Sequence, residues 1–369
     1  MKKLKSIIFG LIAGANIVTI LVMLLLGFAD HVSPADHPTL STLGLLFPFA
    51  ALANLAFLFF WLIVKWRWAL IPFVGFLVAY APMRVYMPMN LPSSPPDDAI
   101  KVISFNSAGF VYNINCDNPF EQLTDYLRQS KADILCIQED NNGKQKMTDF
   151  YNSLYPYNDT VKVNTSKSSP NNLGIHTRFP ILRKEVIDYH SPSNGSVAWY
   201  LKVGNDTLIV INNHLESSHL NQSDRSQYEQ IVAGGMKGDT ARTESRRLLG
   251  KLAEAAVKRA PAADSVHQYI ERHAHYPILV CGDFNDHPLS YTRRTIAKGL
   301  TDCFVSTGNG LGISFNHYDM YFRIDHMMCS ENITPYHCFV DSKIVASDHY
   351  PVICWLKIDR NHSKMHEKA

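Results

Sequence analysis

The first 98 residues of this 369-residue chain contain almost no charge. Six basic and four acidic residues lie there, which leaves 29 of the 35 basic and 29 of the 33 acidic residues for residues 99–369. The larger part of the chain therefore has no net formal charge. It lacks the general basic field expected of a strong nucleic-acid binder. A net charge of zero does not exclude a local basic groove.

Cysteine pairs of the CxxC type are also absent, which argues against a zinc ribbon or a thioredoxin-like motif. Several of the seven cysteines lie in apolar runs such as "DILCIQ", "ILVCGD" and "PVICWL", where we expect buried, small apolar side chains. The odd count argues against a complete set of disulfide pairs, but it does not exclude one or two disulfide bridges. Internal repeats and low-complexity segments are lacking as well.

Long uncharged runs fill much of residues 1–88. Residues 6–29 and 40–64 carry no charge, and each run reaches the ~20 residues that a helix needs to cross a bilayer. A third run, residues 68–83, is shorter and contains two prolines, so it either spans or is re-entrant. The alternatives are a cleaved signal peptide for the first run and a buried globular helix for the second. We expect two to three transmembrane helices, followed by a linker at residues 89–98, "MNLPSSPPDD".

The positions of Lys and Arg predict how these helices are oriented. "MKKLK" precedes the first run and "KWRW" lies between the second and third, whereas the loop "DHVSPADHPT" has neither residue. The positive-inside rule places the first two segments in the cytoplasm. With three spans, which we favour, the protein is a multi-pass protein of the inner (cytoplasmic) membrane. Its soluble domain then lies on the periplasmic or extracellular side; a re-entrant third run would leave it in the cytoplasm.

Residues 99–359 mix apolar, strand-like runs with amphipathic helical patterns, which predicts an α/β or α+β domain with a sizeable core. A hairpin turn is expected at Gly204–Asn205. Helices are expected at residues 118–132 and 242–259, and a separate helix is expected to begin near Pro261. Residues 360–369 are predicted to be a polar tail. The expected strands lie in "AIKVISFNS", "DILCIQED", "NLGIHTRFPI", "VAWYLKVGNDTLIVINNHLES", "YPILVCGDFND", "RIDHMMCS" and "SDHYPVICWLKI".

Polar residues that suit metal and phosphate chemistry stand at the ends of most of these strands. Taken singly, each has an ordinary alternative: a cap, a solvated strand end, a core histidine or, for Asp325, an ion pair with Arg323. Their order and context together match one pattern, which favours a site. The residues are Asn106, Glu139, His214, Asp283, Asn285, Asp325, Asp348 and His349.

In the order "SFNS", "IQED", "GIHTRFPI", "NNHLES", "CGDFND", "RIDHM" and "SDHYPV", the chain resembles the endonuclease/exonuclease/phosphatase family. That family includes deoxyribonuclease-I-like nucleases, apurinic endonucleases, neutral sphingomyelinases, deadenylases and inositol polyphosphate 5-phosphatases. The resemblance covers residues 99–359, and "GDFN" and "SDHYPV" are its most specific parts. It implies a four-layer α/β sandwich, in which two packed mixed β-sheets are flanked by helices, here preceded by the transmembrane region.

The resemblance also implies a divalent metal, Mg²⁺ with Mn²⁺ possible, held by Glu139 with Asn106 and Asp348 beside it. An anionic phosphodiester repels nucleophiles, so its hydrolysis needs a hard cation, an oriented water and a stabilised leaving group. Mg²⁺ prefers oxygen ligands and keeps several waters, so one or two carboxylates are enough.

The remaining five residues are implied to act on the water and the phosphate. Asp283 and Asn285 would orient the attacking water and the phosphate. His349 would take a proton from the water or bind a phosphoryl oxygen, and Asp325 would hold its tautomer. His214 would stabilise the developing negative charge or protonate the leaving oxygen.

The expected function is a membrane-tethered, metal-dependent phosphoesterase that hydrolyses phosphodiesters of lipid headgroups or nucleic acid. Its expected partners are that substrate and the bilayer, with no protein partner inferred. One alternative is a nuclease acting on extracytoplasmic DNA or RNA. The resemblance makes it less favourable, because Ser107 and Ala108 follow Asn106 where many nucleases of the family carry a further polar ligand or an arginine. Another is a non-catalytic scaffold, which the complete set of site residues argues against. Residues 217–276 are read either as a surface helix pair or as a substrate-selecting lid.

Overall fold

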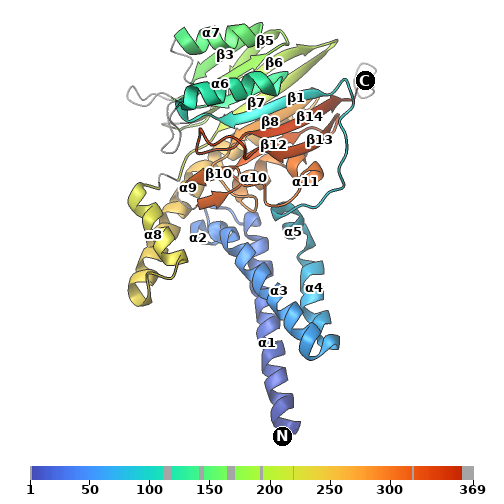
Figure 1. Cartoon of the computed structure of the whole chain (residues 1–369), viewed down its shortest axis with the longest axis vertical. Helices are drawn as coiled ribbons and strands as arrows, with labels where there is room; N and C mark the ends of the chain where they lie inside the picture. The colour runs from blue at the N-terminus through green and yellow to red at the C-terminus, as the bar shows by residue number, and fades with distance from the viewer. Residues whose placement is uncertain are drawn as a thin grey trace.

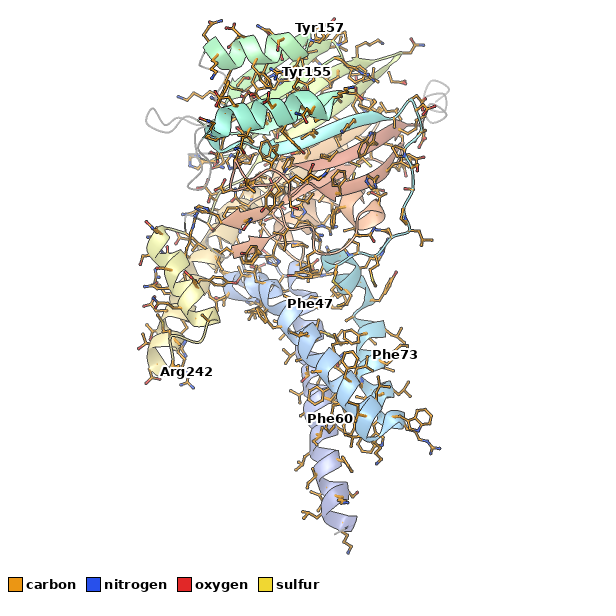
Figure 2. All side chains as sticks on the ribbon, in the orientation of Figure 1. Phe47, Phe60, Phe73, Tyr155, Tyr157 and Arg242 are labelled. Carbon is orange, nitrogen blue, oxygen red and sulfur yellow. The ribbon has the colours of Figure 1, made fainter. Side chains whose placement is uncertain are left out.

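The computed structural model describes residues 2–110, 118–140, 145–163, 171–191, 194–218, 220–317 and 320–359. The predicted polar tail and Cys116 lie outside these residues. Figure 1 shows an α/β body from which a bundle of N-terminal helices extends along the long axis of the molecule. Figure 2 marks Phe60 and Phe73 on those helices, and the side chain of Phe73 is half exposed.

Two N-terminal helical segments are long and apolar enough to cross a membrane among the described residues, namely Lys3–His31 and Pro38–Val64. A third segment consists of two short helices bent by 65° at a break, and it counts as a span only if the pair is taken as one. The two long runs are thus found as expected, and the third span stays a prediction. The helices are α1 (Lys2–Gly27), η1 (Ala29–His31), α2 (Pro38–Thr42), η2 (Leu43–Leu46), α3 (Phe47–Val64), η3 (Trp66–Ala69), α4 (Leu70–Val78) and α5 (Tyr80–Tyr86).

A buried polar network joins three of these helices. Asn16 on α1 donates its side-chain amide to Asn54 Oδ1 on α3 at 3.0 Å, and Asn54 donates to the carbonyl of Pro72 on α4 at 3.0 Å. Trp61 Nε1 donates to Asn16 Oδ1 at 3.3 Å. Buried amide and indole groups in apolar surroundings cost free energy unless they form hydrogen bonds with one another. The network therefore specifies how these helices pack.

The body contains two six-stranded mixed sheets. The first has the strand order β13-β14-β1-β2-β4-β3 and the second β5-β6-β7-β8-β12-β9. The pairs β1/β2 and β7/β8 are parallel, and the other pairs are antiparallel. The strands are β1 (Ile100–Asn106), β2 (Ile134–Gln138), β3 (Tyr157–Lys162), β4 (Asn172–Thr177), β5 (Ile181–Val186), β6 (Gly195–Val203), β7 (Asp206–His214), β8 (Ile278–Asp283), β9 (Thr301–Asp302), β12 (Asp325–Cys329), β13 (Ile333–Val340) and β14 (Val352–Ile358), with a separate hairpin of β10 (Phe315–His317) and β11 (Met320–Phe322).

The sheets pack face to face, and helices cover both outer faces. Apolar side chains from both sheets, such as Val102 and Trp199, share one core. Leu123 of α6 belongs to the core outside the first sheet, and Val266 of α9 to the core outside the second. This arrangement confirms the four-layer sandwich. The helices of the body are α6 (Pro119–Ser130), α7 (Gln145–Leu154), α8 (Gln222–Val232), α9 (Gly238–Arg272), α10 (Tyr291–Ile296) and α11 (Cys303–Thr307).

The expectation of two helices separated at Pro261 was wrong, because α9 runs through this residue without a break. A proline inside a helix removes one backbone hydrogen bond and costs about 3 kcal/mol. Pro261 is exposed, whereas Ala260, Ala262 and Ala263 beside it are buried, the last two in the core outside the second sheet. Burial on both sides of the proline therefore outweighs the missing bond.

The predicted linker has no helix or strand, but its first part is held against the body. The backbone amide of Asn90 donates to Asn309 Oδ1 at 2.6 Å, and its side chain donates to the carbonyl of Val305 at 3.1 Å. No disulfide joins the six cysteines that the structure describes, and all six are buried. The one or two disulfide bridges that the sequence left possible are therefore not formed among these six cysteines.

Candidate active site

The polar strand ends meet at one edge of the sandwich because the central strands run in parallel pairs. β1 and β2 end side by side in the first sheet, and β7 and β8 do so in the second. All eight residues that the sequence singled out lie at this edge, and none of them is exposed. Carboxyl ends of neighbouring parallel strands in open α/β sheets are where ligands commonly bind.

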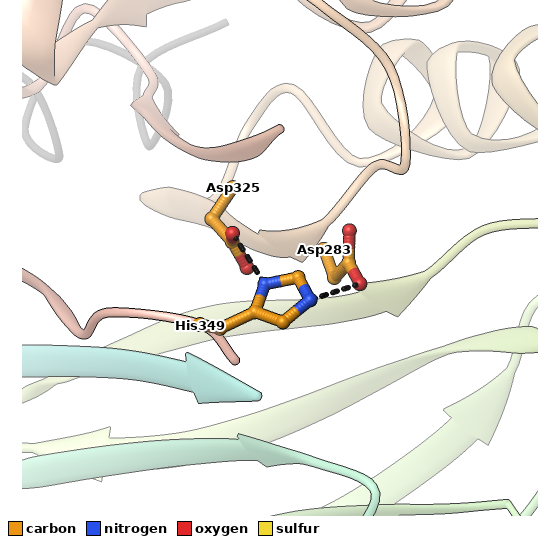
Figure 3. Close-up of side chains that lie close together, drawn as sticks. All are labelled: Asp283, Asp325 and His349. Atoms are coloured by element: carbon orange, nitrogen blue, oxygen red, sulfur yellow. Dashed lines mark hydrogen bonds and ion pairs between the residues drawn. The ribbon is translucent and has the colours of Figure 1, made fainter. Parts of the chain in front are cut away.

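Oxygen Oδ2 of Asp283 is the point on which four of these side chains converge. Asn106 Nδ2 donates to it at 3.1 Å and Asn285 Nδ2 at 3.3 Å. His214 Nε2 lies 3.6 Å away and His349 Nε2 lies 3.7 Å away. Figure 3 shows Asp283 and His349 facing each other across this gap. Burial raises the pKa of Asp283 against the opposing charges of the histidines, so this carboxyl binds a proton more readily than an ordinary one.

His349 is held from its other side by Asp325. Its Nδ1 lies 2.8 Å from Asp325 Oδ2, and both side chains are buried. Burial disfavours the imidazolium, but the carboxylates of Asp325 and Asp283 outweigh it and raise the pKa of His349 well above its ordinary value. The ordinary alternative for Asp325 was wrong, because Arg323 donates instead to the carbonyls of Leu311 and Val85.

Asn106, Glu139 and Asp348 form the second half of the site. Asn106 Nδ2 donates to Glu139 Oε1 at 3.3 Å. Burial raises the pKa of Glu139, the bond from Asn106 lowers it, and the nearby charge of Asp348 raises it further. Glu139 has a positive φ of 56°, which is uncommon for a residue with a side chain and often marks a functional position. Asn106 and the half-buried carboxylates of Glu139 and Asp348 therefore form one group, in which the amide oxygen of Asn106 accepts the backbone amide of Ala108.

His214 and Asn285 are fixed by neighbours of their own. His214 Nδ1 lies 2.9 Å from Asn171 Nδ2 and 3.2 Å from its Oδ1, so that the ring has an amide partner in either tautomer. Burial lowers the pKa of His214. Asn285, with a φ of 51°, donates its side-chain amide to the carbonyl of Leu215 at 2.9 Å. Its backbone amide donates to Asp283 Oδ1 at 2.8 Å.

Three supporting residues were not predicted as site residues. Ser347 donates to the carbonyl of Asn106 at 2.8 Å and accepts the backbone amide of His349 at 3.2 Å, which joins β1 to the "SDH" loop. The ring centroid of Phe315 lies 5.1 Å from that of His349. Ser347 is the first residue of the motif "SDHYPV" and could have been predicted as a site residue. Asn171 and Phe315 belong to no motif that would have predicted their role.

One cluster of side chains in this site can hold a metal ion. Ligand atoms of Asp283, Asp325 and His349 lie within 4.8 Å of one another, and this cluster can hold an ion of unknown identity. The carboxylates of Glu139 and Asp348 are oxygen ligands of the kind that a hard cation such as Mg²⁺ prefers, whereas Asn106 turns its Nδ2 toward Glu139. A shared cation would also offset the unfavourable burial of Glu139 beside Asp348.

Two family models match segments of this chain. The model of the "Endonuclease/Exonuclease/phosphatase family" matches residues 104–349, and a "Domain of unknown function (DUF8431)" matches residues 7–86. No curated protein matches the sequence.

Solved structures are similar to this chain at low sequence identity. The human Nocturnin catalytic domain with bound sulfate is 13% identical, with a TM-score of 0.52, and the match covers 72% of this chain and 96% of that one. D. rerio TDP2 complexed with single-strand DNA product is 14% identical, with a TM-score of 0.49 and 71% and 100% covered. Bacteroides thetaiotaomicron mannosyl-6-phosphatase Bt3783 is 18% identical, with a TM-score of 0.47 and 70% and 100% covered. The family match, which spans most of the chain, shows that this protein belongs to the endonuclease/exonuclease/phosphatase family.

Proposed function

We propose that this protein is a membrane-tethered, divalent-metal-dependent phosphoesterase that hydrolyses phosphodiester bonds. The observation that carries the proposal is the convergence of two imidazoles and two amides on one buried carboxylate oxygen of Asp283. A structural carboxylate needs only one or two partners. Four polar side chains around one oxygen, at the edge where the strands end, form a place for a water and a phosphate group.

Glu139, Asn106 and Asp348 are the residues we assign to the metal. Glu139 and Asp348 supply carboxylate oxygens, and a rotation of the Asn106 amide would bring its oxygen to the place that Nδ2 now occupies beside Glu139. Both ring nitrogens of His349, in contrast, face carboxylates, one of them in a 2.8 Å bond to Asp325. The bound cation would supply charge neutralisation at the phosphate and lower the pKa of a bound water.

The chain's own residues then orient the water and move its proton. Asp283 accepts the proton of the attacking water, and the amide of Asn285 holds the water and the phosphate in line. His349, oriented by Asp325, donates Nε2–H to a phosphoryl oxygen. His214, oriented by Asn171, faces the same space and donates to the leaving oxygen.

The complete set of polar groups argues against the scaffold alternative, since a domain that only binds partners has no need to bury them together. The side chains at the site do not distinguish a lipid phosphodiester from a nucleic acid. The neutral charge of residues 99–369 favours the lipid. Location in the inner membrane, with the body on the extracytoplasmic side, belongs to the same proposal and rests on the placement of Lys and Arg.

The test uses the full chain in detergent or nanodiscs, with Mg²⁺ or Mn²⁺ and with EDTA. Substrates are bis-(p-nitrophenyl) phosphate, p-nitrophenyl phosphate, plasmid DNA, single-stranded RNA, sphingomyelin and phosphatidylcholine. We expect metal-dependent turnover of diesters, reduced about 10²–10⁴-fold in His349→Ala because a positioned proton donor is lost.

The matched control is His190→Ala, which removes an exposed histidine outside the site and should leave turnover unchanged. Turnover that survives both EDTA and His349→Ala would refute the proposal. So would a folded wild-type protein that turns over none of these substrates and binds no divalent metal.

A further inference from the structure

The helical hairpin of α8 and α9 projects from the body toward the side from which the candidate spans extend. In Figure 1 it lies beside the upper part of these helices. In Figure 2, Arg242 near its tip lies lower along the long axis than Phe47, where α3 begins. If α3 crosses a bilayer, the hairpin tip reaches the level of that bilayer's surface.

The hairpin cannot swing freely, because it is fixed at its base. The first buried residue of α9 is Leu248, so residues 238–247 extend beyond the body by about 15 Å at the rise of an α-helix. Asp224 on α8 binds Arg247 and Lys251 on α9, each at 2.6 Å. Further along, α9 packs against α2 of the membrane region. The positions of the tip and of the candidate spans are therefore coupled.

The tip has the chemistry of an interfacial segment. Residues 231–238, "IVAGGMKG", carry apolar or small side chains and one cation. Lys237 and Arg246 are exposed and make no hydrogen bond or ion pair with the residues that the structure describes, and Arg242 makes only an exposed contact of 3.7 Å with Asp239. Apolar side chains flanked by Lys and Arg are typical of segments that lie among lipid headgroups.

We propose that residues 231–246 form a second membrane contact, with the tip inserted among the headgroups of the leaflet next to the body. The occupant of this surface is the bilayer that holds the chain's own helices, since the tip and the spans extend in one direction. This inference rests on the membrane anchoring in the proposed function.

The contact also links the bilayer to the site. The ring of Tyr228 on α8 lies 6.4 Å from that of Phe322 on β11. The guanidinium of Arg225 lies 6.0 Å from the ring of Phe315, which contacts His349. A hairpin resting on lipid would thus hold the rim of the site near phosphodiesters in the membrane.

The test measures depth in the membrane and needs no turnover, so its result is independent of the proposed activity. In a Cys116→Ser background, Gly235→Cys and Leu182→Cys are labelled with a membrane-impermeant thiol reagent that carries an environment-sensitive dye.

The structure supports this choice of positions, because the six cysteines that it describes are buried. Leu182 is 54% exposed on β5, at the far end of the body (Figure 1). A Cβ at Gly235 would meet only the Gln230 carbonyl at 3.6 Å, so the substitution fits.

The full chain is reconstituted into phosphatidylcholine–phosphatidylglycerol vesicles with a quencher placed high on the acyl chains. We expect the dye at position 235 to be blue-shifted and quenched several-fold more than the dye at 182. Lys237→Glu with Arg246→Glu should reduce that quenching. Equal quenching at 235 and 182, repeated with Lys237→Cys in place of Gly235→Cys, would overturn the proposal.

Discussion

Asp283 shows how the surroundings of one residue decide what it can do. The same carboxylate at the end of an exposed strand would be an ordinary turn acid. Here it is buried between His214 and His349, and burial raises its pKa. Because two amides and two imidazoles also approach it, the position is suited to accept a proton from a bound water.

At His326, we predict a pH-dependent loss of stability. Burial lowers the pKa of this histidine to about 4, and its Nε2 lies 3.0 Å from the carbonyl of Asp286. The unfolded chain, with a histidine pKa of about 6.5, binds the proton more readily, so stability falls as the pH drops from 6.5 toward 4. The full effect is about 3 kcal/mol.

The measurement is the thermal unfolding of the full chain in detergent at pH 7.5 and pH 5, for wild type and His326→Gln. We expect the variant to lose less stability on acidification than the wild type. The exposed residue His275 serves as the control through His275→Gln, which should keep the wild-type pH dependence. An equal loss in wild type and His326→Gln would show that His326 does not titrate as described.

Most central strands were predictable because buried strands read as continuous apolar runs. β1, β2, β7, β8 and β14 are of this kind. Edge strands such as β3 and β5 were missed, because none of their residues is fully buried and their sequences lack a clear alternation. Pro261 misled the prediction for the opposite reason, since packing on the second sheet overrides a local breaker.

The site could be predicted only as a set of residue types at strand ends. The sequence carries no sign of the positive φ at Glu139, whereas Asn285 is at least a residue type that adopts a positive φ more often than most. The contact of Asn171 with His214 joins segments 43 residues apart, and no motif marks it. The packing of η2 on the loop after Asn285 could not be predicted from the sequence either, because it joins the N-terminal helices to a distant segment of the body.

That packing leads to a prediction at Gly44. A Cβ at this glycine would lie 2.5 Å from the carbonyl of Leu289 and 2.7 Å from the ring of His287, both on the loop that follows Asn285. Gly44→Val should push η2 and this loop apart, at a cost of about 1–3 kcal/mol of overpacking. We expect a lower Tm of the full chain in detergent and reduced turnover.

The matched control is Gly10→Val on α1, where an added Cβ meets nothing within 4 Å. That variant should keep the wild-type Tm and turnover. If Gly44→Val behaves like Gly10→Val, the contact between η2 and the loop has no role in holding the site.

At the scale of the whole molecule, the N-terminal helices and the body form one packed unit. Leu289 of the body shares an apolar cluster with Met23 and Phe47 of the helices. Arg323 is buried and donates to the carbonyl of Val85, and Arg294 lies 3.7 Å from Asp30. The helices are thus more than a tether, because they cover part of the body next to the site.

Removal of residues 1–88 should therefore weaken the body. The truncated chain exposes Leu289 and leaves Arg323 without one of its carbonyl partners, which carries a desolvation cost for a charged group. We expect a lower Tm than that of the full chain in the same detergent, together with increased binding of an apolar dye. An unchanged Tm and no added dye binding would mean that the body is stable without the helices.

The central claim is that a cation bound by Glu139 and its neighbours acts beside the group formed by Asp283, His349 and Asp325. The most direct test measures Mn²⁺ binding by electron paramagnetic resonance, and turnover of bis-(p-nitrophenyl) phosphate, on the same preparations of full-length wild type, Glu139→Ala and Asp325→Asn. We predict that Glu139→Ala loses both the ion and turnover, whereas Asp325→Asn keeps the ion and loses turnover. If Glu139→Ala still binds Mn²⁺ and Asp325→Asn does not, the ion sits in the Asp283–Asp325–His349 cluster and the assignment is contradicted.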